Sequence, residues 1–109
     1  KANTDDMRDS ASLTMIPALI NKGAIIKYYD PTGFKNEFKK YKNVSFCNSI
    51  DKAIQNSDLI IIHTEWNDFK SINFKKILKK RRVIIFDMRN IYSASKIKEQ
   101  GFKYVGIGR

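Results

Sequence analysis

The sequence predicts an α/β fold, a three-layer Rossmann-like domain in which helices flank a mostly parallel sheet. Two observations predict it. Short runs rich in β-branched and aromatic residues alternate along the chain with amphipathic runs of helical period. Two of the strand-like runs, residues 59–62 and 83–86, are continuously apolar, as expected for strands covered on both faces. Alternation of this kind requires crossover connections between parallel strands.

The 109 residues fit one domain with a single hydrophobic core. The chain opens at Lys1 rather than at a methionine, in a polar run. We therefore expect residues 1–109 to be one domain of a larger protein.

The first predicted helix is capped by Ser10 and carries apolar residues as far as Ile20. Gly23 is placed to end it, because glycine adopts the left-handed conformation that closes many helices. Pro17 falls within this helix and removes a backbone donor, so we expect it early in the helix or at a bend.

The remaining elements follow from apolar runs bounded by turn residues. The turn at residues 30–33 stops the first strand, Asn73 caps one helix, and Ser93 or Ser95 starts the last. The expected strands cover residues 24–29, 44–46, 59–62, 83–86 and 102–105, and the expected helices cover residues 34–41, 49–54, 73–78 and 93–101.

The formal net charge of +10 attracts phosphate groups. Two interpretations stay open, solvated lysine-rich helix faces or a surface for nucleic acid. The single cysteine, Cys47, excludes an internal disulfide and fits a reducing compartment, so we expect a cytoplasmic protein. No apolar run approaches the roughly 20 residues that span a bilayer, and no Cys/His cluster has the spacing of a metal site.

Ligands of open parallel sheets bind beyond the carboxyl ends of the strands. Arg89 follows one such end, where its guanidinium can hold phosphate or sugar oxygens; a surface pair with Asp87 is the alternative. Trp66 is either a packing anchor or a wall of the ligand cleft. His63 could be a base but has no evident acid partner in sequence, and Cys47 fits an inert thiol.

At these same places the chain resembles the C-terminal UDP-binding domain of the UDP-glucose/GDP-mannose dehydrogenase family. The resemblance covers essentially the whole chain. It is carried by the opening Lys-x-Asn-Thr-Asp-Asp-x-Arg-x-Ser at residues 1–10, Tyr-Asp-Pro at 29–31, Thr-Glu-Trp at 64–66, Asp-x-Arg-Asn at 87–90 and the closing Gly-Ile-Gly-Arg at 106–109.

The resemblance implies a function. Family members oxidise the C6 alcohol of a nucleotide sugar to a carboxylate in two hydride transfers to NAD. The NAD fingerprint G-x-G-x-x-G and the family's catalytic cysteine motif are absent from this chain, and Cys47 does not match that motif. We therefore expect no catalytic residue here, and no activity from the isolated chain.

Three residues take a role from the resemblance. Lys1 and Arg89 match the lysine and the arginine that contact the nucleotide sugar, and Arg8 matches an arginine that faces NAD. The implied partners are a UDP-sugar and the rest of the same polypeptide, in a homo-oligomer without membrane or nucleic acid. UDP-glucose is the first substrate hypothesis. UDP-N-acetylmannosamine, GDP-mannose and a non-catalytic basic nucleotide- or nucleic-acid-binding module stay open.

Overall fold

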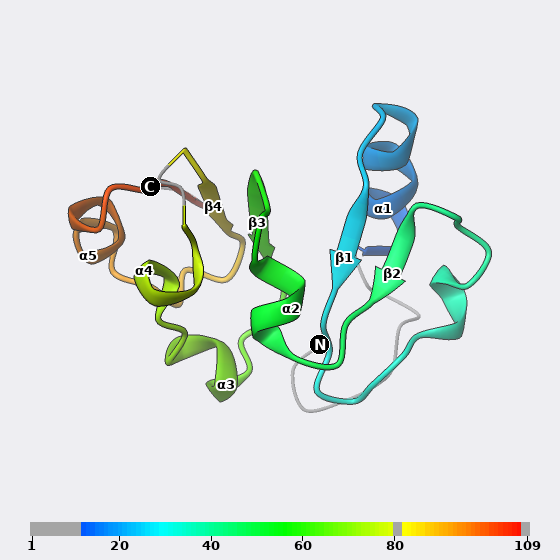
Figure 1. Cartoon of the computed structure of the whole chain (residues 1–109), viewed down its shortest axis with the longest axis horizontal. Helices are drawn as coiled ribbons and strands as arrows, with labels where there is room; N and C mark the ends of the chain where they lie inside the picture. The colour runs from blue at the N-terminus through cyan, green and yellow to red at the C-terminus, as the bar shows by residue number, and fades with distance from the viewer. Residues whose placement is uncertain (1–11, 80–81, 108–109) are drawn as a thin grey trace. The chain divides into compact units, whose positions relative to one another are not determined.

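The computed structural model describes residues 12–79 and 82–107. The described chain divides into two compact units, the first ending at Ala53 and the second beginning at Ile54. Figure 1 traces both, with helices alternating with strands in each. Every strand pair is parallel, so the predicted α/β, Rossmann-like class is confirmed. The strands lie in two sheets, one in each unit.

The first helix, α1 (Ser12–Asn21), ends as the sequence predicts. Gly23 has a φ of 87° and donates its N–H to the carbonyl of Ile20 at 2.9 Å. The N–H of Ala24 reaches back to the carbonyl of Leu19 at 3.1 Å. These two bonds satisfy carbonyls that the last turn of a helix leaves without an intrahelical donor.

Pro17 lies in the interior of α1 rather than in its first turn. Since proline has no amide hydrogen, position 17 cannot donate to the carbonyl of Leu13 four residues earlier. The predicted cap, Ser10, lies outside the described residues.

The sheet of the first unit joins β1 (Ile26–Tyr28) to β2 (Val44–Phe46) in parallel, with Tyr28 opposite Phe46. The tyrosine ring packs edge-on against Phe46 at 5.4 Å and against Phe38 at 5.3 Å between ring centroids. Such aromatic pairs stabilise a small sheet beyond the area they bury. β1 is shorter than the predicted strand over residues 24–29.

The helix predicted over residues 34–41 is wrong in type and extent. The structure has only a 3₁₀ turn, η1 (Asn36–Phe38). Lys35 precedes it with an extended backbone (φ −109°, ψ 119°), and its N–H bonds the hydroxyl of Tyr28 at 2.9 Å. A tertiary hydrogen bond thus holds Lys35 outside any helix.

Helix α2 (Ile50–Ile54) begins where predicted. The hydroxyl of Ser49 accepts the N–H of Lys52 at 3.2 Å, which is the capping bond expected of a serine at this position.

The second unit holds a three-stranded sheet in the order β3 (Leu59–Ile62), β4 (Ile84–Asp87), β5 (Lys103–Gly106). The connections between neighbouring strands contain α3 (Asn67–Lys70) and α4 (Phe74–Ile77), then α5 (Ala94–Glu99). β4 and β5 each begin one residue later than predicted, so Asp87 belongs to β4 rather than to the loop after it. α3 was not predicted.

The helix boundaries of this unit agree with the sequence. Asn73 caps α4 by accepting the N–H of Lys76 at 3.2 Å. Ser93 stands at the N-cap position of α5 without a side-chain capping bond, and Gly101 closes that helix with a φ of 95°. Among the described residues, no helix has both the length and the apolar content to cross a membrane.

Only one face of this sheet is fully covered in the described structure. Alternate residues of β3 and β4, Ile60, Ile62 and Ile85, are at most 5% exposed. On the other face Leu59 and Ile84 are 43% and 37% exposed, so the expectation that both apolar strands are covered on both faces is wrong. The covered side belongs to a core that also contains Phe69, Phe74, Leu78, Val83, Tyr92, Ile97 and Phe102.

Candidate functional site

The parallel register of the second unit brings three strand ends to one edge. Ile62, Asp87 and Gly106 form the last row of the sheet. The chain leaves this row through His63, the residue after β3, and reaches Arg89 two residues beyond β4. This is the edge at which the sequence placed the ligand.

Asp87 anchors the loop after β4. Its side chain is fully buried, and its two oxygens accept three hydrogen bonds. The donors are the N–H of Arg89 at 3.1 Å, the N–H of Tyr92 at 3.0 Å and the hydroxyl of Tyr104 at 2.8 Å. A buried carboxylate requires such partners, and here they fold the loop back onto the strand end.

Tyr92 extends this anchor to the next connection. Its hydroxyl donates to the backbone carbonyl of Phe69. Burial raises the pKa of Tyr92 well above its ordinary value, and the negative charge of Asp87 adds to the shift. The phenol therefore keeps its proton, and with it the hydrogen bond, at neutral pH.

The guanidinium of Arg89 has a different partner from the backbone of the same residue. It pairs with Glu65 at 3.9 Å between Nη2 and Oε1, and the two side chains are 44% and 54% exposed. The alternative of a surface pair between Arg89 and Asp87 is wrong, since Asp87 is buried and receives the backbone N–H instead. A long, exposed ion pair contributes little to stability, so an anionic ligand can take the place of Glu65.

Asn90 ties the ends of β4 and β5 together. Its amide nitrogen donates to the carbonyl of Ile107 at 2.9 Å, and its amide oxygen accepts the N–H of Ile107 at 3.0 Å. Sequence reasoning assigned no role to this residue, because its partner lies 17 positions away.

His63 lies half-buried at the same edge. Burial lowers its pKa, and the positive charge of Arg89 contributes in the same direction. The imidazole is therefore neutral at pH 7. The structure does not test the possible role of His63 as a base, and both a structural and a chemical role stay open.

Trp66 precedes α3, and its carbonyl accepts the N–H of Phe69 at 3.0 Å. The residue is half-buried, and its indole Nε1 is buried without a hydrogen-bond partner in the described structure. Both proposed roles, anchor and cleft wall, stay open.

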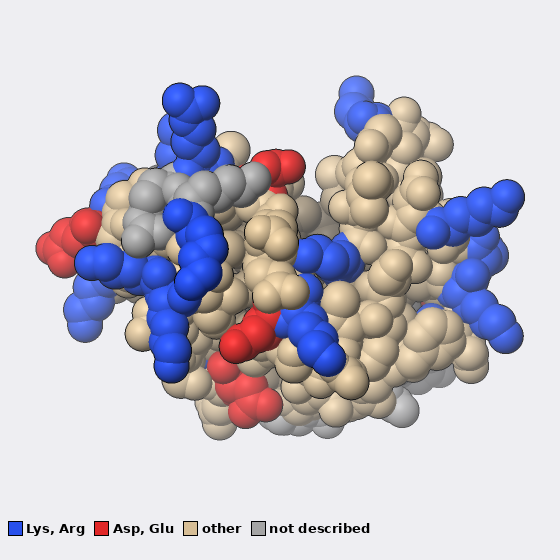
Figure 2. All heavy atoms as spheres, in the orientation of Figure 1, with Lys and Arg blue, Asp and Glu red and all other residues tan. Residues whose placement is uncertain are grey.

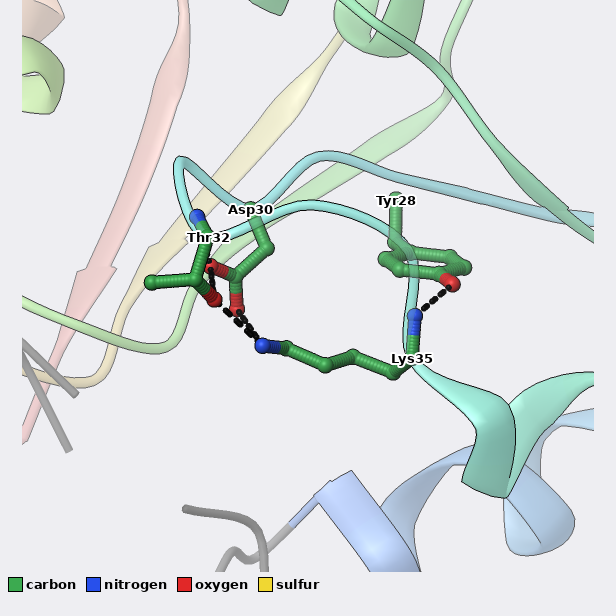
Figure 3. A network of polar contacts seen from close by, with 4 residues as sticks. All are labelled: Tyr28, Asp30, Thr32 and Lys35. Atoms are coloured by element: carbon green, nitrogen blue, oxygen red, sulfur yellow. Dashed lines mark hydrogen bonds and ion pairs between the residues drawn. The ribbon is translucent and has the colours of Figure 1, made fainter. Parts of the chain in front are cut away.

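The first unit has a polar network of its own at the end of β1, drawn in Figure 3. Lys35 is 5% exposed; its ammonium donates to the hydroxyl of Thr32 and pairs with Asp30 at 3.8 Å. Asp30 also accepts the N–H and the hydroxyl of Thr32, at 2.8 and 2.6 Å. The network closes the turn that the sequence predicted at residues 30–33. Lys35 itself was not predicted, since nothing in its local pattern indicates burial.

Two of the three predicted site residues, Lys1 and Arg8, lie outside the described residues, so of the three the structure places only Arg89. Cys47 is a half-buried free thiol after β2, and its N–H bonds the carbonyl of Tyr28 at 2.8 Å. Across residues 12–79 and 82–107, no three histidine, cysteine or carboxylate side chains gather as a metal site would need.

A parallel sheet with an anchored arginine at its carboxyl edge defines the class: a Rossmann-like α/β domain of the kind that binds nucleotides. Comparison with known proteins gives the family. Residues 1–94 match the model of the UDP-glucose/GDP-mannose dehydrogenase family, UDP binding domain. The chain belongs to this family.

Three relatives illustrate the similarity, each named UDP-glucose 6-dehydrogenase. The Rhizobium meliloti protein is 36% identical over 110 residues, covering 100% of this chain and 25% of the relative. The Rickettsia bellii protein is 38% identical, covering 99% and 26%. The Pseudomonas aeruginosa protein is 32% identical, covering 100% and 26%. The chain thus spans about a quarter of the length of each of these three relatives.

Proposed function

We propose that this chain is the nucleotide-sugar-binding domain of an NAD-dependent UDP-glucose 6-dehydrogenase, which converts UDP-glucose to UDP-glucuronate in two hydride transfers. Residues 1–109 form the UDP-sugar-binding part of that longer polypeptide. The family membership and the names of the relatives support the proposal. The observation that carries it is the position of Arg89 at the carboxyl edge of the sheet: its backbone N–H is bonded to the buried Asp87, and its guanidinium is exposed.

Arg89 is the proposed contact to the substrate. Its planar fork of donors suits the oxygens of a diphosphate or a sugar. Lys1 is proposed as a second cation toward the same ligand, by its match to the family's opening motif. No catalytic residue is proposed within this chain.

The described residues do not form the turn that is typical of an NAD-binding site. The turn after β1 has one glycine, Gly33, rather than the G-x-G-x-x-G pattern that lets a backbone approach a pyrophosphate, and its Asp30 and Lys35 belong to an internal network. We propose that NAD, the hydride acceptor, binds chiefly to the rest of the polypeptide and that Arg8 faces it. The proposal includes a homo-oligomeric, cytoplasmic enzyme.

The full-length enzyme with Arg89→Ala tests the proposal. Losing a charged contact to the substrate is expected to lower kcat/KM for UDP-glucose by about 2–4 kcal/mol of transition-state stabilisation. Arg82→Ala is the matched control: Arg82 is also exposed, but it precedes β4 and so lies at the amino end of that strand. An unchanged kcat/KM in Arg89→Ala removes Arg89 from the site.

Other substrates of the same family, UDP-N-acetylmannosamine and GDP-mannose, are the second candidates. Turnover of the full-length protein with the three nucleotide sugars distinguishes them.

The basic charge favours one candidate of another class, a nucleotide- or nucleic-acid-binding module without catalysis. Figure 2 shows lysine and arginine side chains projecting at several separate places on the face in view, interspersed with neutral surface and a few acidic side chains. Such scattered charges fit solvated faces better than a continuous binding track. Affinity for duplex DNA that falls steeply with salt would favour the module instead.

A further inference from the structure

The loop that carries Arg89 ends in an unusual backbone conformation. Asn90 has a φ of 55°, in the left-handed region that residues with a Cβ rarely adopt. Asparagine tolerates this region better than other such residues. Asn90 directly follows the turn at residues 88–89, and its side chain reaches Ile107 just past the end of β5.

The side-chain amide of Asn90 then behaves as a strand neighbour would. It donates to the carbonyl of Ile107 at 2.9 Å and accepts the N–H of the same residue at 3.0 Å. The β4–β5 ladder pairs Asp87 with Gly106, and Ile107 is the next residue of its chain. The amide thus continues the pairing one residue past the end of the sheet.

Arg89 is consequently fixed on both sides. Its own N–H is bound to the buried carboxylate of Asp87 at 3.1 Å, and the following residue is bound to Ile107 through two hydrogen bonds. The remaining freedom of Arg89 is that of its side chain alone. A charged side chain on a backbone held in this way loses less entropy when it binds a ligand than one on a mobile loop.

We propose that Asn90 is a positioning residue for substrate binding: by clamping Ile107 it holds the backbone of Arg89 where the guanidinium meets the nucleotide sugar. This inference rests on the proposed function, since it requires Arg89 to contact the substrate. Asn90 itself does not touch the ligand in this account.

Asn90→Gly in the full-length enzyme tests the clamp. Glycine accepts the positive φ without strain and removes both hydrogen bonds to Ile107. The expected result is a roughly tenfold fall in kcat/KM for UDP-glucose, the size expected for two modest hydrogen bonds. Asn90→Asp keeps the acceptor for the Ile107 N–H and should recover part of the loss. It also serves as the second variant if Asn90→Gly does not fold.

The decisive readout is the double variant Arg89→Ala/Asn90→Gly. If Asn90 acts through Arg89, its loss has no further effect once Arg89 is alanine, whereas a merely structural role gives losses that multiply. Asn56→Gly is the matched control, because Asn56 is exposed and has a φ of 62° but precedes β3. That variant should match the wild type.

The outcomes separate the two proposals. Wild-type kcat/KM in Asn90→Gly, or multiplying losses in the double variant, overturns the clamp and leaves the proposed function intact if Arg89→Ala is impaired. Full activity of Arg89→Ala, or no turnover of UDP-glucose by the wild type, overturns the proposed function and the clamp with it.

Discussion

At the residue scale, the positive charge of Arg89 helps to lower the pKa of His63, the residue that follows β3. Burial is the main cause of the lowered His63 pKa, and the guanidinium adds to it. This electrostatic interaction acts between the ends of β3 and β4, and it can be measured in the absence of ligand. It gives a direct check on where the arginine points.

Arg89→Ala is expected to raise the pKa of His63 toward its ordinary value near 6.5. A proton-detected pH titration by NMR measures this, and the chain contains one histidine, so its signal is unambiguous. Arg82→Ala should leave the titration unchanged. An unmoved His63 pKa in Arg89→Ala would show that the guanidinium does not act on the imidazole.

The same shift affects stability, and its sign follows from the two states. The unfolded chain binds a proton on His63 near pH 6.5, while the folded chain binds it only at lower pH. The stability that His63 contributes is therefore present above pH 6.5 and is lost as the pH falls through the folded pKa. His63→Gln should flatten this part of the unfolding free energy measured by denaturant titration at each pH.

The sequence predicts that Arg89 lies just past a strand end, but it does not predict the residues that hold its backbone. Arg89 follows a clear apolar strand, and its charge suits a ligand at that edge. Tyr104 and Ile107 reach Asp87 and Asn90 across 17 positions, a relation that only the register of β4 and β5 creates. Local pattern carries no information about such pairs.

At the scale of elements, predictions held where local chemistry decides the outcome. The boundary at Gly23, the cap at Asn73 and the apolar run of β3 each depend on residues within one or two turns. The predicted helix over residues 34–41 is reduced to a 3₁₀ turn, and Lys35 before it is extended, with its N–H bonded to the hydroxyl of Tyr28 on a strand. Tertiary contacts override weak helix propensity.

Gly23→Ala tests the end of α1. An added Cβ meets no atom within 4 Å, so the cost comes only from the φ of 87°. We expect a loss of about 1 kcal/mol in the free energy of unfolding, measured by denaturant titration. Gly23→Asn should lose less, because asparagine tolerates the left-handed region. Equal stability of all three proteins would show that this backbone conformation is not retained in solution.

At the scale of the whole molecule, alternating strands and helices predicted the parallel α/β class, and the sheet edges followed from it. The division of the strands between two sheets was not predicted. The apolar content of residues 24–29 and 44–46 marks them as strands but does not indicate which other strands they pair with. The partial exposure of Leu59 and Ile84 was likewise missed, since continuous apolar runs do not show which faces are covered.

The central claim is that the edge carrying Arg89 binds the anionic part of a nucleotide sugar. Calorimetric titration of the full-length protein with UDP tests it most directly, because binding is measured without turnover or NAD. The account predicts that Arg89→Ala raises the Kd for UDP by at least about tenfold while Arg82→Ala does not. Equal UDP affinity in the wild type and Arg89→Ala would contradict it.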